Sequence, residues 1–324
     1  MYRKISAIVI PTLIAAGILG YMLYTVWGQL LDALRHIILS YLIVAILICL
    51  MAWLLRGWRY HRILVGMDNP VNIRIATACI FISQTANLIV PFRLGDFVRV
   101  FILNHENQTH YSDGIASIVV ERVFDIVTVA LLGLVAFPFV LNVDPAYFLI
   151  IVLILGIGAL FFLFLFFVNR LQSQNMYIKI ILTMLHEIRK ASLTPRSIVI
   201  LGFSSIVIWI LDVLVCLSVV MMFGQDVSFP TIVFAIVIGN IIKAVPITPG
   251  GLGTYEYLVA KILNLGGMPD IYANLVAIID HLIKNLVTVA GGVVSIYYFG
   301  DWVIPSIKTA LDSKLGGGGD PPVS

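Results

Sequence analysis

Two interruptions of apolar segments constrain the fold of this chain most. The first reads Pro91-Phe-Arg-Leu-Gly-Asp and the second reads Pro249-Gly-Gly-Leu-Gly-Thr, so both follow the pattern Pro-x-x-Leu-Gly. Each lies where hydropathy alone would predict one continuous helix. Charged residues follow at matching distances: Glu121, Arg122 and Asp125 lie 30, 31 and 34 residues after Pro91, and Asp280, His281 and Lys284 lie 31, 32 and 35 residues after Pro249. Matching Gly/Pro interruptions in two halves are typical of transport proteins with broken helices.

The apolar content of the chain indicates a polytopic all-α membrane protein. Of its 324 residues, 60% are apolar and only 11% are charged, whereas soluble domains carry roughly 25% charged residues. About 20 apolar residues suffice to cross a bilayer as a helix. The first apolar run is too long for a signal peptide, so we expect it to remain as an uncleaved span. The predicted spans are 5–27, 37–55, 114–140, 147–168, 197–223 and 271–299.

The segments around the two interruptions are predicted to be re-entrant hairpins. Segments 73–92 and 230–247 would be the first arms, and 94–103 and 254–265, which are too short to cross, would be the second arms. Basic residues decide between this topology and one with eight spans. Six spans and two hairpins leave thirteen basic residues on the side of both termini, among them Arg56 and Arg59, and only Arg35 opposite. The positive-inside rule therefore predicts that both termini are cytoplasmic.

This topology makes the two halves inverted repeats. The first hairpin enters from the cytoplasm and the second from outside, as in many transporters. We expect a single transport domain over 1–315, with half-repeats at roughly 37–140 and 197–299, and a flexible cytoplasmic tail over 316–324. The predicted location is the cell membrane.

Twelve ionisable residues lie at membrane depth in this topology. Each costs about 2.5–3.5 kcal/mol at the bilayer centre, so they must face one another, water or a charged substrate. The three cysteines lie singly in apolar segments, and we expect them to be buried apolar groups with no disulfide or metal role. The basic members of the set are Arg93, Arg99, Arg122, Lys243, Lys261 and Lys284; the acidic members are Asp96, Glu121, Asp125, Asp212, Glu256 and Asp280.

The spacing of these charges predicts specific contacts. Glu121 and Asp125 lie one turn apart on one helix face, so a cation from elsewhere, such as Arg93 or Arg99, is expected between them. Asp280 and Lys284 form a favourable pair one turn apart. Such residues can also be buried ion pairs that fix only the register of the helices.

The glycines of the second interruption predict close approach of the backbone to a ligand. Gly250, Gly251 and Gly253 allow conformations closed to other residues, although a kink or a packing contact would use them too. A helix that starts at Thr254 would direct free N–H groups at an anion, with Glu256 nearby. Arginine suits phosphate recognition. His281 would relay protons or form a hydrogen bond in the core.

These motifs carry a family resemblance. The runs Asn87-Leu-Ile-Val-Pro-Phe-Arg-Leu-Gly-Asp-Phe-Val-Arg, Glu121-Arg-Val-Phe-Asp and Pro249-Gly-Gly-Leu-Gly-Thr-Tyr-Glu resemble the lysylphosphatidylglycerol synthase transmembrane family. That family includes the flippase half of the bacterial multiple peptide resistance factor and the membrane region of an archaeal dolichol-phosphate glycosyltransferase. The commoner Gly-Glu of the family is Gly95-Asp96 here. Only a short Gly/Pro tail follows residue 315, so we expect no aminoacyl-transferring domain.

The resemblance implies translocation of a lipid or a lipid-linked substrate. It carries functional roles onto Arg93, Asp96, Arg99, Glu121, Arg122, Asp125, Gly250, Gly251, Gly253 and Glu256. Together with the charge analysis, which adds five more residues, the candidate translocation residues also include Lys243, Thr254, Asp280, His281 and Lys284.

Three function classes follow from the sequence. The first is a flippase for an anionic phospholipid or a polyprenyl-phosphate-linked glycan, supplied by a separate synthase or glycosyltransferase. The second is a secondary transporter of a small ion or solute, for which a closed central cavity is expected. The third is a membrane-embedded transferase acting on a lipid phosphate, for which a metal between Asp96, Glu121 and Asp125 is expected. The sequence contains no P-loop, HExxH or GxSxG motif. We therefore expect a transporter without cofactor, metal or nucleic-acid partner.

Overall fold

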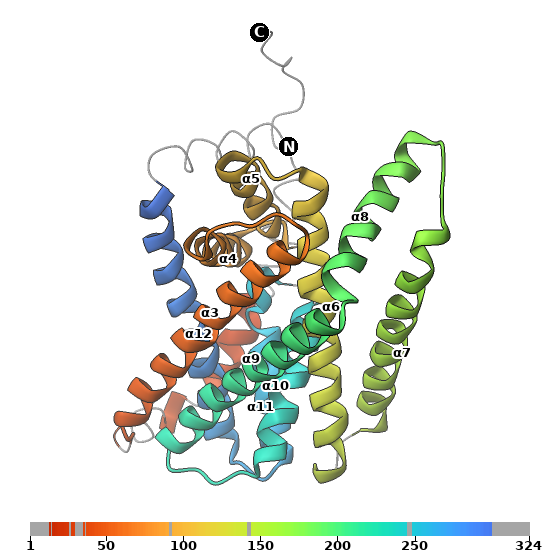
Figure 1. Ribbon diagram of the computed structural model, residues 1–324. Coiled ribbons are helices and arrows are strands. Elements are labelled where there is room, and N and C mark those ends of the chain that lie inside the picture. Colours follow the sequence, from red (N-terminus) through yellow and green to blue (C-terminus); the bar gives the residue numbers. More distant parts are fainter. Residues whose placement is uncertain are drawn as a thin grey trace.

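The computed structural model describes residues 13, 15–25, 27–29, 35, 37–90, 93–140, 144–244 and 248–299. These residues form helices joined by turns, with no strand among them, which confirms the all-α prediction (Figure 1). The α-helices are α3 (Ser40–Gly66), α4 (Ile73–Ile89), α5 (Asp96–Asn107), α6 (Tyr111–Ala136), α7 (Pro145–Phe167), α8 (Met176–Ser192), α9 (Pro195–Met222), α10 (Phe229–Ala244), α11 (Thr254–Leu265) and α12 (Asp270–Phe299). Short 3-10 turns lie at η1 (Trp27–Gln29), η3 (Phe137–Phe139), η4 (Val168–Arg170) and η5 (Pro249–Gly251).

The long helices lie close to the predicted spans. Helices α6, α7, α9 and α12 correspond to 114–140, 147–168, 197–223 and 271–299, with ends that differ by about four residues at most. Of the predicted span 5–27, Ala15–Thr25 is a short apolar helix, and most of the remainder lies outside the described residues, as does the predicted tail 316–324. Four described helices are long and apolar enough to cross a membrane, namely α3, α7 with η4, α9 and α12.

Side-chain caps explain where three of these helices begin. Asn72 accepts a hydrogen bond from the Arg74 N–H at the start of α4. Asp144 and Thr194 do the same before α7 and α9, accepting from the N–H groups of Ala146 and Ser197. In α7 and α9 a proline follows the cap, where its missing N–H costs nothing.

Helix α3 corrects one predicted boundary. The predicted span ends at residue 55 and places Arg56 and Arg59 in a cytoplasmic loop, but α3 continues to Gly66. The Arg59 side chain is only 1% exposed, and Arg56 forms an ion pair inside the protein. Two of the thirteen basic residues used in the topology argument are therefore structural charges of the interior.

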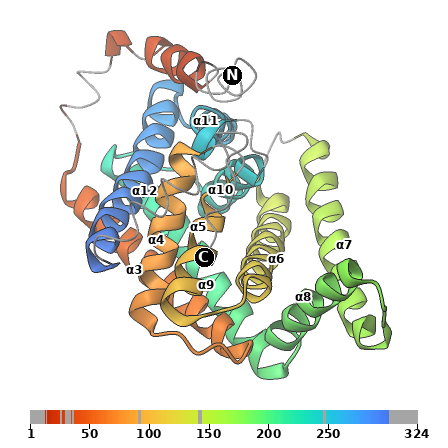
Figure 2. The same cartoon turned by 90° about the horizontal axis from the view of Figure 1, so that it is seen from above.

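A second difference concerns the predicted loop 169–196, which contains the helix α8. Helix α8 packs against α6 and α3, and its exposed first turns are rich in apolar side chains such as Met176 and Tyr177. Figures 1 and 2 both place α7 and α8 at one side of the bundle. Only 17% of the most apolar stretch of α7 is buried, compared with 44% in α9 and α12, so α7 lies at the periphery and α9 and α12 are more deeply packed.

Two separate apolar clusters make up the core. One contains residues of α10 and α11 with most of the buried apolar residues of α9 and α12, and the other contains residues of α4 and α5 with residues of α3 and α6. Helix α3 crosses from one cluster at Cys49 to the other at Tyr60, and Arg56 and Arg59 lie between them. Helix α6 likewise passes from Val120 to Val129 through its charged turn. The protein thus has two apolar layers with a charged layer between them.

The arms of each predicted hairpin are separate helices that pack on each other. Helix α4 has 17 residues and α5 has 12, whereas α10 has 16 and α11 has 12. Contacts join α4 to α5 and α10 to α11. In Figure 1, α4 and α5 lie in the upper part of the molecule, and α10 and α11 lie in the lower part.

Candidate functional site

The two interruptions of the sequence meet in the middle of the protein. Turn η5 packs against α4, and a Cβ added at Gly250 would lie 2.8 Å from Leu88 Cδ2, near the end of α4. Gly250 and Gly251 have φ angles of 61° and 78°, which side-chain-bearing residues rarely adopt. Arg93 has a φ angle of 54° as well. Both interruptions therefore contain residues with a left-handed backbone conformation.

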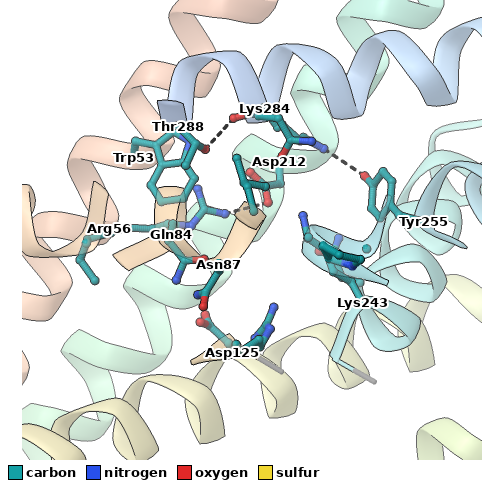
Figure 3. Close-up of a pocket in the computed structure, with 18 of the residues that line it drawn as sticks. Trp53, Arg56, Gln84, Asn87, Asp125, Asp212, Lys243, Tyr255, Lys284 and Thr288 are labelled. Atoms are coloured by element: carbon teal, nitrogen blue, oxygen red, sulfur yellow. Dashed lines mark hydrogen bonds and ion pairs between the residues drawn. The ribbon is translucent and has the colours of Figure 1, made fainter. Parts of the chain in front are cut away.

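A polar cavity of about 120 Å³ lies beside this contact. Its lining comes from α3, α4, α6, α9, α10, η5, α11 and α12, and thus from both hairpins and the long helices around them. Figure 3 shows Trp53 and Arg56 on one side and Lys243 and Tyr255 on the other. The polar and aromatic lining residues are Trp53, Arg56, Gln84, Asn87, Arg93, Glu121, Arg122, Asp125, Trp209, Asp212, Asn240, Lys243, Thr248, Tyr255, Lys284, Asn285 and Thr288.

Each of the three candidate carboxylates of the first half, Asp96, Glu121 and Asp125, is paired with an arginine. Arg122 Nη2 donates to Asp96 Oδ2 at 2.9 Å, and Arg99 Nη1 lies 2.5 Å from Glu121 Oε2. Arg99 thus contacts Glu121 but not Asp125, and the cation within 4 Å of both carboxylates is Arg59 rather than Arg93 or Arg99. Asn87 also donates to Asp96, at 2.9 Å, which ties the end of α4 to the start of α5.

Asp125 has a partner that the sequence reasoning missed. Arg59 donates to both of its oxygens, at 2.7 and 3.0 Å, and also to Ser205 Oγ at 2.7 Å. Trp209 Nε1 donates to Asp125 Oδ1 at 3.1 Å. Arg59 was missed because the predicted span stops at the first arginine of α3, although the apolar spacing continues to Ile63 and Leu64.

Arg56 is held between two tryptophans on the cavity wall. Its guanidinium lies 4.8 Å from the ring centre of Trp53 and 6.0 Å from that of Trp209. Arg56 Nη2 donates to Asp212 Oδ2 at 2.7 Å. Asp212 was predicted at membrane depth, but Arg56 was not. The spacing of α3 could have indicated that Arg56 lies inside the protein, because Arg56 and Arg59 are three residues apart and share one helix face.

The polar residues of the second half form two connected groups. In one, Lys284 Nζ lies 2.8 Å from Asp280 Oδ1, and Tyr255 donates to Asp280 Oδ2 at 2.8 Å. The predicted pair one turn apart is thus present. In the other, Glu256 Oε2 accepts from the Gly253 N–H at 2.7 Å, and Glu256 Oε1 lies 2.7 Å from His281 Nδ1. The start of α11 therefore already holds a negative group of its own.

Two basic residues of the cavity differ from the others. Within the described part of the chain, no carboxylate lies within 4 Å of Arg93 or Lys243, whereas Arg56, Arg122 and Lys284 each have one. Lys243 Nζ lies 3.1 Å from His281 Nε2. The lining carries five basic and three acidic side chains, an excess of two. Adding the charged residues that contact them gives seven basic and five acidic, again an excess of two; the added residues are Arg59, Arg99, Asp96 and Asp280.

The structure brings the predicted residues of both halves to one place. Eight of the fifteen line the cavity: Arg93, Glu121, Arg122, Asp125, Lys243, Gly250, Gly251 and Lys284. The other seven do not line the cavity. Four of them contact a lining residue, namely Asp96, Arg99, Asp280 and His281. A fifth, Gly253, donates its backbone N–H to Glu256. Of the remaining two, Glu256 binds His281 and Thr254 Oγ1 donates to the Gly251 carbonyl at 3.1 Å. Beyond the charged residues, the sequence reasoning missed the amides and the tryptophans.

The carboxylates of the first half are not arranged to hold a metal ion. Each of Asp96, Glu121 and Asp125 has its own arginine, so none is left as a free ligand. In the described residues, no group of three His, Cys, Asp or Glu side chains could hold a metal ion. Cys49, Cys79 and Cys216 are buried, as predicted.

The site lies in a region of sequence shared with known membrane proteins. The chain is 30% identical over 295 residues to Glycosyltransferase AglD from Haloferax volcanii, which covers 77% of this chain and 47% of AglD. It is 27% identical to a UPF0104 membrane protein from Methanocaldococcus jannaschii, over 65% of this chain and 92% of that protein. A further UPF0104 membrane protein, from Methanothermobacter thermautotrophicus, is 22% identical over 89% of this chain. The chain therefore spans about half the length of AglD. The family model described as the lysylphosphatidylglycerol synthase TM region matches residues 8–292, and the chain belongs to this family.

Proposed function

We propose that the protein moves an anionic lipid, either a phospholipid or a polyprenyl-phosphate-linked lipid, between the leaflets of the cell membrane. The observation that carries this proposal is the pair of unmatched cations, Arg93 and Lys243. One comes from each hairpin, and both line the same polar cavity, where their side chains are partly buried. A cation that is partly withdrawn from water without a carboxylate partner is costly, so a site that keeps two of them is suited to a substrate that supplies the negative charge.

The size of the cavity supports recognition of a head group alone. At about 120 Å³ it is smaller than the roughly 300–1,000 Å³ pockets that enclose drug-sized ligands. A phosphate group fits such a space, and acyl or polyprenyl chains remain in the surrounding lipid. The amide side chains Gln84, Asn87, Asn240 and Asn285 offer donors and acceptors to the rest of the head group.

We infer that each hairpin is re-entrant and that the halves are inverted. Arms of 12 to 17 residues are shorter than the ~20 residues that a span needs. Each hairpin belongs to its own apolar cluster, and the tips touch between the clusters. The basic residues that remain outside the interior still favour cytoplasmic termini.

Lipid exchange in liposomes tests the proposed function. Purified protein is reconstituted with fluorescent phosphatidylglycerol, and a membrane-impermeant quencher reports leaflet exposure. Charged hydrogen bonds contribute about 1.5–3 kcal/mol, so Arg93→Gln and Lys243→Gln should each slow exchange about 10- to 100-fold. The matched control is Lys261→Gln, because Lys261 lies on the second hairpin, is exposed and does not line the cavity.

Three results would overturn the proposal. One is wild-type protein that exchanges no anionic lipid but takes up a soluble anion, which would indicate a solute transporter. Another is covalent modification of the lipid phosphate, which would indicate a transferase. The third is equal exchange by the Arg93, Lys243 and Lys261 variants.

Thiol labelling tests the topology separately. Single cysteines at Gln108, after the first hairpin, and at Gln174, before α8, should react from the same side of the membrane. A cysteine at Asp226, between α9 and α10, should react from the other side. The native cysteines are buried and give a low background. Opposite labelling of positions 108 and 174 would exclude a re-entrant first hairpin.

A further inference from the structure

A chain of hydrogen bonds leads from the cavity to the tip of the second hairpin. It starts at Lys243 on the cavity wall, passes through His281 and Glu256, and ends at the Gly253 N–H, with distances of 3.1, 2.7 and 2.7 Å. His281 is 1% exposed and Glu256 is 3% exposed. Helices α10, α11 and α12 each contribute one side chain to this chain of hydrogen bonds, and its last donor is the backbone N–H of Gly253, just before α11.

Donor and acceptor chemistry fixes the protonation of His281 in this arrangement. A lysine ammonium group can only donate, so His281 Nε2 must accept from Lys243. His281 Nδ1 then carries the proton and donates to Glu256 Oε1, because a carboxylate can only accept. The imidazole is therefore neutral while Lys243 holds it. An imidazolium would direct a second N–H at the ammonium group, with two positive charges about 3 Å apart.

From this geometry we propose that His281 is a proton-binding site coupled to anion binding at Lys243. This inference rests on the proposed function. An anion in the cavity offsets the charge of the ammonium group and draws Lys243 away from His281. One proton from water then adds to the free Nε2, and the imidazolium is stabilised by Glu256 on its other side. Protonation of His281 Nε2 is the only covalent change in this step. Anion and proton thus bind together and are released together.

The other charged groups around His281 do not replace Lys243 in this role. From α11, Tyr255 stacks on the imidazole, with ring centres 4.5 Å apart, and its hydroxyl is bound to Asp280. From α12 itself, Asp280 is paired with Lys284. From α3 and α9, Arg56 and Asp212 pair with each other. In the described structure, Lys243 is the one cation in contact with His281 that no carboxylate neutralises. An anion in the cavity therefore weakens the repulsion between Lys243 and a protonated His281 more than that from any other cation.

Calorimetry with the full chain in detergent tests this coupling. The probe is dihexanoyl phosphatidylglycerol, whose phosphodiester does not titrate near neutral pH. Binding is measured at one pH in PIPES and in imidazole, because the difference in buffer ionisation enthalpy gives the number of protons taken up. We expect up to about one proton per bound lipid, and an affinity that rises up to about tenfold for each unit fall in pH.

The variants separate His281 from other histidines. His281→Gln keeps an acceptor for Lys243 and a donor for Glu256 but cannot bind a proton, so proton uptake and the pH dependence of the affinity should vanish. The matched control is His61→Gln. His61 is part-buried on α3 and bound to the Val71 carbonyl at 2.7 Å, and its loss should leave uptake as in the wild type. Glu256→Gln should reduce uptake by removing the carboxylate beside the imidazole.

The outcomes distinguish this inference from the proposed function. Wild-type protein that binds the lipid without taking up a proton would overturn the coupling and leave the proposed function intact. Uptake that persists in His281→Gln would also overturn it. Wild-type protein that binds no phosphatidylglycerol and exchanges none in liposomes would overturn the proposed function and this inference together. If His281→Gln does not fold, the coupling is still tested in two ways: by the difference in wild-type binding enthalpy between the two buffers, and by the number of protons that Glu256→Gln takes up.

Discussion

Replacing Arg59 with methionine tests whether the charged layer is held by buried pairs. Arg59→Met keeps the length of the side chain but removes both hydrogen bonds to Asp125 and the one to Ser205. Breaking a buried ion pair costs about 3–5 kcal/mol, because one charge stays buried alone. Asp125 would keep one donor, Trp209 Nε1, so we expect the lower end, about 3 kcal/mol of unfolding free energy.

A double-mutant cycle refines this magnitude. Arg59→Met with Asp125→Leu removes both charges. Ser205 and Trp209 then lose a hydrogen-bond partner, whereas Glu121 loses a contact of 3.9 Å but keeps Arg99. At about 1 kcal/mol for each unsatisfied group, the double variant should be about 1–2 kcal/mol less stable than the wild type and more stable than Arg59→Met alone. The control is Arg74→Met, because Arg74 is exposed at the start of α4 and should change stability by less than about 0.5 kcal/mol.

Unfolding in mixed micelles measures these values. Increasing SDS unfolds the protein, and a thiol-reactive dye reports the exposure of Cys49, Cys79 and Cys216, which are buried in the folded state. Arg59→Met within about 1 kcal/mol of the wild type would refute the reasoning. So would a double variant that is less stable than Arg59→Met, because the stabilisation would then not come from the pairing of the charges.

Two further predictions concern the cavity wall. Gly251→Val should stop lipid exchange in liposomes while the protein stays folded, because φ is 78° and a Cβ there would lie 2.8 Å from Lys243 Cγ; normal exchange would contradict the role of the tip. Glu121→Lys should lower the amount of folded protein in the membrane more than Glu121→Gln, because a lysine would face Arg99 and Arg59, which lie 2.5 and 3.9 Å from the present carboxylate; quantitative immunoblotting of membranes compares the two, and equal abundance would contradict it.

The sequence predicted the long helices well because hydropathy depends on local composition. The ends of α7, α9 and α12 differ from the predicted spans by two residues or fewer. The prediction for α3 was wrong at its C-terminal end because a charge was interpreted as the edge of the membrane. Arg56 and Arg59 lie inside the protein instead, where Asp212 and Asp125 match them.

The pairing of the charges was only partly predictable. Asp280 and Lys284 lie on one helix, so their spacing predicted the contact. The partners of Asp125 and Asp212 come from 66 and 156 residues earlier in the chain, and helix periodicity says nothing about which helices become neighbours. The same reason explains why the contact between Lys243 and His281 emerged only from the fold.

The charged layer has a consequence for how the chain enters the membrane. Helix α6 is long enough to cross, with 26 residues, but Glu121, Arg122 and Asp125 lie within it. At about 2.5–3.5 kcal/mol each, these charges oppose release of α6 alone from the translocon into lipid. Helix α3 precedes α6 in the chain and carries Arg59, the partner of Asp125, whereas Arg99 on α5 precedes Glu121. The order of synthesis therefore delivers the counter-ions of Glu121 and Asp125, and the Asp96 partner of Arg122, before α6 itself, and α6 can integrate as part of a neutral assembly.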